Sequence, residues 1–178
     1  MELKSFVKHY ENVLSPQTCE RIIQEFENNR SHITQYDNEH YKFDQLDLNT
    51  SGNQLLAKAF IQQVVPYLKN YISLLSVEPY VKIRGFENVR IKKYLKGSDY
   101  KFKTHVDVDD KDSAVRYLIF ILYLNDNNGC TTFPNLGLSF KPKQGSMIMF
   151  PPFWMFPHSG ETPTDNDKYI MMSCLHYS

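Results

Sequence analysis

The spacing of apolar residues changes near the middle of the chain. Up to about residue 75, apolar side chains recur every three or four positions, the period of an amphipathic helix. After about residue 87 they gather in short runs rich in β-branched and aromatic residues, which are typical of strands. The pattern therefore predicts helices first and a β-rich region after them.

The first helix is predicted to begin at Ser15-Pro16. A serine can cap the first turn, and proline at the first helical position loses no hydrogen bond. Ile22, Ile23 and Phe26 then supply an apolar stripe at helical spacing. This helix has one face suited to burial.

A second helix is predicted from about Asn53 to Leu75, with one broad apolar face. Pro66 lies inside it, and proline removes a backbone donor and crowds the preceding turn, so we expect a kink or a break there. The polar, tyrosine-rich segment from Arg30 to Thr50 reads as loop with a short strand.

Five later segments have the composition of strands: NVRIKKYL, RYLIFILYL, LSFKP, SMIMF and KYIMMSCL. Turn-forming stretches such as NDNNG and TPTDND separate them. Many short strands at close intervals favour a sandwich, jelly roll or barrel, with the helices packed on one sheet. No linker divides the chain, so we expect one domain over residues 1–178, with helical support over about 1–80 and a β core over about 84–178.

Composition limits the classes of binding partner and the cellular location that are expected. Lys+Arg and Asp+Glu both number 20, so the net charge of 0 shows no global footprint for nucleic acid. The N-terminal residues do not resemble a signal peptide and no apolar run is long enough to span a membrane, so a soluble cytoplasmic or other intracellular protein is expected. Cys19, Cys130 and Cys174 lie far apart and are expected to be reduced thiols.

Candidate chemistry begins with His105-Val106-Asp107. In an extended backbone, residues i and i+2 point to the same side, so one strand end can present an imidazole and a carboxylate together. His158, in PHSGETP near the end of a strand-like segment, can supply a third ligand. Two histidines and one carboxylate suit Fe(II) oxygenases, because they leave open positions on the metal. Taken alone, His105 and Asp107 are better explained as a surface pair, and His158 as a core or solvent-facing histidine.

Two further residues extend the pattern. Lys168 follows His158 by ten positions and begins a predicted strand. Tyr94 precedes His105, and a buried tyrosine hydroxyl needs a polar partner. Alone, they would read as a surface lysine and a core tyrosine. His176 is an alternative third ligand, but no lysine or arginine follows it.

Together these residues resemble the Fe(II)/2-oxoglutarate-dependent dioxygenase superfamily, and within it the prolyl 4-hydroxylase branch. The signature is a tyrosine, then His-x-Asp, then a distal histidine followed ten residues later by lysine. GCTTFP and KPKQGSMIMFPP are also similar to scaffold segments of that branch. The resemblance covers about residues 84–178 and, more loosely, the N-terminal helices.

The resemblance implies a double-stranded β-helix (a jelly-roll, cupin-like core) that binds Fe(II) and 2-oxoglutarate and consumes O₂, with ascorbate as a possible reductant. It implies hydroxylation of a prolyl residue in a protein or peptide by a monomeric enzyme, with release of succinate and CO₂. The residues it implicates are His105, Asp107 and His158 for iron, and Lys168, Tyr94, Thr131 and Tyr123 for 2-oxoglutarate. Apart from the resemblance, Arg84, Arg116 and Trp154 are candidate substrate contacts; structural ion pairs are the alternative for the two arginines, and hydrophobic packing is the alternative for Trp154.

The chain also departs from the prolyl hydroxylase pattern. Asn128-Gly129 stands where the branch usually has Gly-Gly, Cys130 replaces an acidic residue, and Cys174 stands where a tryptophan is common. Two alternatives therefore remain open. One is the same chemistry on a small molecule or nucleobase, and the other is a jelly-roll structural or binding module without activity.

Overall fold

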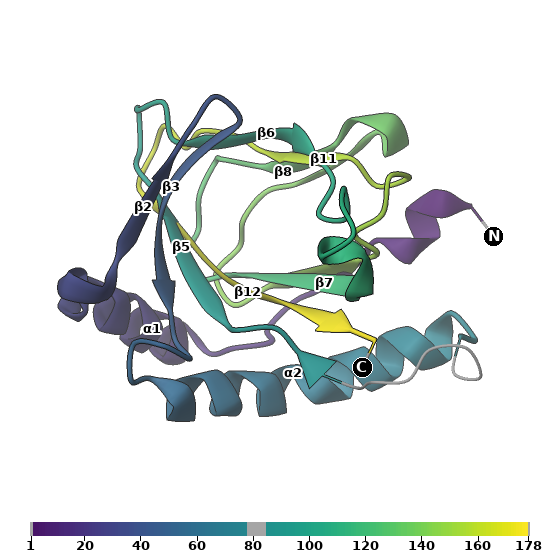
Figure 1. Cartoon of the computed structure of the whole chain (residues 1–178), viewed down its shortest axis with the longest axis horizontal. Helices are drawn as coiled ribbons and strands as arrows, with labels where there is room; N and C mark the ends of the chain where they lie inside the picture. The colour runs from purple at the N-terminus through teal and green to yellow at the C-terminus, as the bar shows by residue number, and fades with distance from the viewer. Residues whose placement is uncertain (1, 78–84, 178) are drawn as a thin grey trace.

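The computed structural model describes residues 2–77 and 85–177. Its strands form one antiparallel sheet that curls into a half-open barrel (Figure 1). The strands are β1 (Lys8–Tyr10), β2 (Thr34–Asp37), β3 (Tyr41–Asp47), β4 (Gly85–Phe86), β5 (Arg90–Tyr94), β6 (Lys101–His105), β7 (Arg116–Tyr123), β8 (Thr131–Phe133), β9 (Leu138–Phe140), β10 (Met147–Phe150), β11 (His158–Gly160) and β12 (Lys168–His176).

The order of pairing follows the curl of the sheet. Along the main path it runs β1-β10-β7-β12-β5-β3-β6-β11-β8-β9, with β2 paired to β3 and β4 to β12. Because of the curl, β6, β8 and β11 lie across the interior from β7 and β12 (Figure 1). The predicted jelly-roll class is confirmed, and all five predicted strand segments form strands.

Two helices cover the outside of this sheet beneath β5, β7 and β12 (Figure 1). They are α1 (Pro16–Asn28) and α2 (Gln54–Leu74), close to the predicted bounds, and the short 3-10 helices are η1 (Leu3–Phe6), η2 (Arg30–His32), η3 (Ser113–Val115) and η4 (Pro134–Leu136). Ser15 caps α1, since its side-chain oxygen accepts a hydrogen bond from the Thr18 backbone N–H at 3.2 Å. Neither α1 nor α2 has the length and apolar character needed to cross a membrane.

The break expected at Pro66 does not occur, because α2 runs through it without interruption. Pro66 lies on the exposed side of the helix, and so does Gln62, whose carbonyl loses its partner to the proline ring. Water can satisfy that carbonyl, which lowers the cost of keeping the helix continuous.

Alternate residues of the long strands enter two separate cores. On β7, Leu118, Phe120 and Leu122 face the helices, whereas Ile119 and Ile121 face the barrel interior. The same alternation on β12 directs Lys168 and Ile170 inward and Tyr169 and Met171 outward. The strand alternation therefore decides which side chains can reach a ligand inside the barrel.

The segment 30–50 is more ordered than the sequence predicted. It forms the hairpin β2–β3, and β3 pairs with both β5 and β6 in the middle of the sheet. Tyr41 and Phe43 of β3 pack inside the barrel. The predicted loop is therefore one wall of the interior.

Candidate active site

The three candidate metal ligands meet at the edge of the barrel. His105 is the last residue of β6, and His158, which begins β11, is its cross-strand partner. Asp107 follows His105 by two positions, as the sequence required. One ligand atom from each of the three residues lies within 4.8 Å of the other two. Separate strands thus bring together a set that the sequence spreads over more than fifty positions.

Backbone contacts orient both imidazoles. The Nδ1 atoms of His105 and His158 lie 2.8 Å and 3.2 Å from the carbonyl oxygens of Lys103 and Phe156. A proton on each Nδ1 satisfies these carbonyls and leaves the lone pair of each Nε2 available to a metal ion, the usual arrangement for a metal-binding histidine. The Nε2 atoms lie 3.8 Å and 3.4 Å from the Asp107 carboxylate oxygens.

The electrostatic setting keeps Asp107 and His158 in their metal-binding forms. Burial alone would raise the pKa of Asp107, but His105 and His158 outweigh it and lower that pKa to about 2. Burial lowers the pKa of His158 to about 4. Near neutral pH, Asp107 is therefore ionised and His158 is neutral, as metal coordination requires.

Arg116 holds the backbone of the metal-ligand loop in place. Its Nη1 donates to the carbonyl oxygen of Asp107 at 2.8 Å, and its Nε donates to Glu87 Oε1 at 2.5 Å. Glu87 also forms an ion pair with Arg90. Arg116 was a candidate substrate contact, and in the structure its guanidinium is engaged in orienting the Asp107 backbone.

An inner cavity of about 30 Å³ adjoins the three ligands. Lys168 lies in its wall with 2% exposure and donates to the carbonyl oxygen of Gly129 at 2.6 Å. Tyr94, its cross-strand partner on β5, places its ring centre 5.6 Å from the ammonium. Thr131 of β8 is buried in the same wall. The residues predicted for 2-oxoglutarate thus gather on the metal side of the barrel.

Tyr123 lies at the deep end of this region, on β7. Its ring centre is 5.9 Å from the Lys168 ammonium, and its hydroxyl is buried without a well-formed hydrogen bond among the described residues. Burial raises the pKa of Tyr123, and the side chain of Thr131 is close enough to oppose that rise. The two hydroxyls are therefore neutral donors beside a buried ammonium.

An outer groove of about 530 Å³ opens on the other side of the metal ligands. One wall is aromatic and comes from the β2–β3 hairpin and β6: Tyr36, Tyr41, Phe43 and Phe102. Cys174 lines the groove at the position where the prolyl hydroxylase branch often has tryptophan. The smaller side chain leaves more room in this groove than a tryptophan would.

Sequence reasoning missed Lys92, which lines both the inner cavity and the outer groove. It is 7% exposed, and its ammonium lies 4.1 Å from the centre of the Phe43 ring. The signal was present in the sequence, since Lys92 precedes Tyr94 by two positions on a strand and must share its face.

Of the two remaining candidate substrate residues, only Trp154 belongs to the described part of the chain. Arg84 lies outside the described residues. Trp154 is 77% exposed and is not part of the wall of either cavity.

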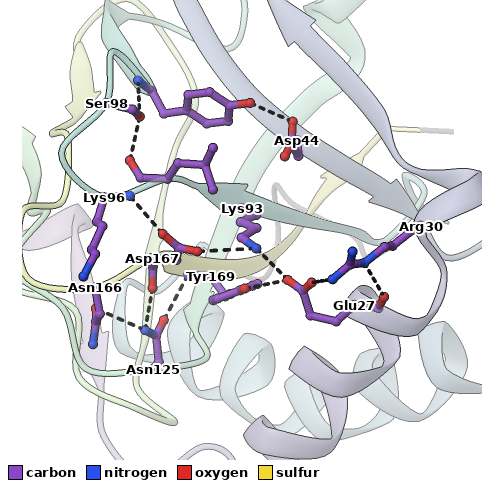
Figure 2. Close-up of polar contacts among 12 residues, drawn as sticks. Glu27, Arg30, Asp44, Lys93, Lys96, Ser98, Asn125, Asn166, Asp167 and Tyr169 are labelled. Carbon is purple, nitrogen blue, oxygen red and sulfur yellow. Dashed lines mark hydrogen bonds and ion pairs between the residues drawn. The ribbon is translucent and has the colours of Figure 1, made fainter.

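On the outer face of β5 and β12, ionic contacts tie the sheet to α1 (Figure 2). Lys93 contacts Glu27 of α1 at 2.7 Å and Asp167 at 3.4 Å. The Tyr169 hydroxyl donates to the same Glu27 oxygen at 2.6 Å. Lys93 and Asp167 are direct neighbours of Tyr94 and Lys168 in the chain, so this cluster fixes from outside the strands that carry the inner pair.

Comparison with known families supports the same assignment. The model of the 2OG-Fe(II) oxygenase superfamily matches residues 89–176, which include all three candidate ligands, Tyr94 and Lys168. No curated protein matches the sequence.

Solved structures with this fold include several prolyl hydroxylases. The viral collagen prolyl hydroxylase of Paramecium bursaria Chlorella virus-1, in its 2-oxoglutarate complex, has a TM-score of 0.69 at 18% identity, with 97% of each chain covered. A prolyl-4-hydroxylase from Pseudomonas putida has a TM-score of 0.71 at 15% identity, covering 97% of this chain and 93% of that one.

A third structure is a prolyl hydroxylase from Trichoplax adhaerens in complex with a peptide fragment of the hypoxia inducible factor oxygen degradation domain. Its TM-score is 0.69 at 15% identity, covering 96% of this chain and 83% of that one. With the family match and the His-Asp-His cluster, the fold leads to one conclusion: residues 89–176 form a 2OG-Fe(II) oxygenase domain, in a chain with a prolyl-hydroxylase-like fold.

Proposed function

We propose that His105, Asp107 and His158 bind Fe(II) and that the enzyme hydroxylates a prolyl residue in a protein or peptide. The observation that carries the proposal is the convergence of the three ligand atoms within 4.8 Å of one another, at the junction of the two cavities. Two imidazoles and one carboxylate match the donor set of non-haem Fe(II) oxygenases.

The polar groups at the site fit a metal ion. Asp107 Oδ2 is buried and lacks a hydrogen-bond donor in the described part of the chain. A buried carboxylate oxygen without a donor is costly, and a cation would remove that cost. The two Nε2 atoms face the same carboxylate, so their lone pairs converge on one point.

The groups in the inner cavity fit a dicarboxylate. Lys168 would bind the far carboxylate of 2-oxoglutarate through a charge-assisted hydrogen bond, and Tyr94, Thr131 and Tyr123 would add neutral donors. The cavity of about 30 Å³ holds only a few water molecules. An ammonium carries three donors and only one is used on the Gly129 carbonyl, so Lys168 can bind a carboxylate without giving up that bond.

Bound Fe(II) and 2-oxoglutarate would supply the O₂ chemistry, in which one oxygen atom would enter the substrate C–H bond and the other would enter succinate as CO₂ is released. The chain's own residues orient the reactants and exclude water. Phe102 stacks on His105 at 3.7 Å between ring centres, and Phe150 packs on His158 at 4.7 Å. Ascorbate is proposed only as an external reductant that maintains Fe(II).

The outer groove supports a peptide substrate. Its aromatic wall resembles the surfaces that bind proline-rich segments in an extended conformation. The viral relative is named as a collagen prolyl hydroxylase, and the Trichoplax structure contains a bound peptide fragment. A monomeric state and an intracellular location stay predictions.

The test is succinate formation from 2-oxoglutarate with Fe(II) and ascorbate, with and without proline-containing peptides, followed by a mass gain of one oxygen on the peptide. Metal-dependent succinate formation without peptide oxidation would support the oxygenase reaction and contradict the proposal of a prolyl substrate. The absence of metal-dependent succinate under every condition would contradict the proposed reaction.

A further inference from the structure

Lys92 is a buried cation that the proposed reaction does not use. It is 7% exposed and forms no hydrogen bond or ion pair with any described residue. Its ammonium lies 4.1 Å from the ring centre of Phe43 and 5.2 Å from that of Phe102. Aromatic faces stabilise a buried ammonium only in part, and a carboxylate partner would do so far better.

The position of Lys92 is the junction between the two cavities. It lines the inner cavity with the metal ligands and the outer groove with the aromatic wall. In the β5–β12 register it pairs with Ile170, two residues from the Tyr94–Lys168 pair towards the groove. An anion bound here would therefore lie on the substrate side of the metal ligands.

The other cations of the groove already have acceptors. Arg90 and Arg116 both contact Glu87, and Arg116 also donates to the Asp107 carbonyl. Lys92 is the lysine of the groove without a direct hydrogen-bond or ion-pair partner among the described residues, and the Asp107 carboxylate acts on it only at longer range. Its ammonium can therefore contact one further negative group beside the aromatic wall.

We propose that Lys92 binds a carboxylate carried by the substrate next to the carbon that is oxidised. The inference rests on the proposed function and narrows its substrate class to acidic ones. The carboxylate can come from an aspartate or glutamate beside the reacting residue, or from the free C-terminus of a short peptide.

The competing occupant is 2-oxoglutarate itself. Its far carboxylate has a receptor in Lys168, which lies with Tyr94 away from the groove. Its other carboxylate would meet the metal, where Asp107 and the two histidines converge. Lys92 borders the metal ligands as well, so the experiment must separate the two carboxylates.

The probes are matched five-residue peptides with a central proline, all acetylated. The two peptides of the first pair both have an amidated C-terminus and differ only in carrying glutamate or glutamine beside the proline. The two peptides of the second pair have no charged side chain and differ only in ending with a free carboxylate or an amide. Binding is measured by calorimetry, without oxygen, to the full chain loaded with Mn(II) and 2-oxoglutarate. Succinate formation with Fe(II) is measured separately, so failure of the proposed reaction is recognised by itself.

We expect at least one carboxylate probe to bind tenfold or more tightly than its amide counterpart. Lys92→Met should reduce that ratio to below twofold, Lys92→Gln should do the same, and Lys92→Arg should retain it. Lys93→Met is the matched control on the opposite face of β5 and should keep the full ratio. The pair that shows the preference identifies the source of the carboxylate.

Three results would overturn the inference. In the first, no carboxylate probe exceeds its amide counterpart in the unmodified protein. In the second, the preference survives in both Lys92→Met and Lys92→Gln. In the third, Lys92→Met weakens 2-oxoglutarate binding tenfold without changing the peptide ratio, which would assign Lys92 to the cosubstrate.

Discussion

The two faces of β5 place adjacent lysines in opposite environments. Lys93 points outward to Glu27, Asp167 and Tyr169 (Figure 2), and although burial alone would lower its pKa, the hydrogen bonds with Glu27 and Tyr169 raise it. Lys92 points inward, and burial lowers its pKa to about 8. Two adjacent lysines thus serve different purposes, one stabilising the fold and the other held at a cost.

The same contrast extends across the sheet. Outside, β5 and β12 are tied to α1 by contacts that satisfy every charge they bring together. Inside, buried groups such as Asp107 Oδ2 and the Tyr123 hydroxyl lack hydrogen-bond donors or acceptors in the described structure. Unsatisfied groups of this kind are expected where a ligand completes the site, and the predictions below separate the two faces.

The largest effect is expected from the inner face at His158. His158→Ala removes one of three ligand atoms that lie within 4.8 Å, so metal binding and metal-dependent succinate formation should fall below detection while the fold is retained. Metal titration and circular dichroism check both parts. His176→Ala is the matched control, because His176 ends β12 outside the His-Asp-His cluster, with its Nδ1 2.9 Å from the Tyr177 carbonyl oxygen. Full activity of His158→Ala would show that the ligand set is wrong.

The next effect is expected at Lys168. Lys168→Ala removes the buried ammonium proposed for the far carboxylate, a charge-assisted hydrogen bond worth about 2–3 kcal/mol. The concentration of 2-oxoglutarate at half-maximal rate should rise by roughly 30- to 150-fold, with little change in the iron requirement. Lys96→Ala, at an exposed lysine before Gly97, is the control. An unchanged 2-oxoglutarate requirement would remove Lys168 from the site.

The sequence predicted what depends on local pattern. Both helices and five strands followed from apolar spacing and from Ser15-Pro16. The wall formed by β3 did not, because YKFDQLD mixes charged and aromatic residues and only two of its seven positions are fully buried. Its place in the sheet is set by pairing with β5 and β6, which no local pattern encodes.

The candidate site shows the same limit. Strand alternation selected His105 and Asp107, because residues i and i+2 point to the same side. The resemblance to the family added His158 and, ten positions later, Lys168. Strand alternation also places Lys92 on the face of Tyr94, but it could not show that Lys93 has a partner and Lys92 has none, because Glu27 lies 66 positions from Lys93 in the chain. Which of two adjacent cations finds a partner is a property of the folded protein.

A third prediction compares the two lysines directly in metal-free protein. Lys92→Met replaces a buried, unpaired ammonium with an apolar side chain, so the free energy of unfolding at neutral pH should rise by roughly 1–3 kcal/mol. Lys93→Met leaves Glu27 and Asp167 without their cation and should lower it by about 1–2 kcal/mol. Urea unfolding measures both, and equal signs for the two variants would contradict the comparison.

The pH dependence sharpens this test. The folded pKa of Lys92, about 8, lies below its ordinary value of 10.5, so the folded state binds fewer protons than the unfolded state between these values. The destabilisation of the folded state by the buried Lys92 ammonium is therefore largest below pH 8, and it decreases as the pH rises towards 10.5. The gain from Lys92→Met should therefore shrink over that range.

The smallest effect is expected at Glu27, on the outer face. Burial alone would raise its pKa, but hydrogen bonds from Lys93 and Tyr169 outweigh burial and lower it below 4.5. A depressed carboxyl pKa stabilises the fold above the unfolded value and loses that contribution as the pH falls through the folded value. Glu27→Gln should cost about 0.5–1 kcal/mol at pH 7, since the side chain is 31% exposed.

Once the pH has fallen through the lowered folded pKa of Glu27, the Glu27→Gln variant and the unmodified protein should converge, because protonated Glu27 and glutamine are both neutral. Glu25→Gln is the matched control, two positions before Glu27 on α1, where the carboxylate accepts a hydrogen bond from Asn29 at 2.7 Å and pairs with no cation among the described residues. Its unfolding curve should change less at pH 7. A Glu27→Gln curve with the same deficit at pH 3 and pH 7 would show that packing, rather than charge, holds Lys93 on the outer face, and the contrast with Lys92 would lose its electrostatic basis.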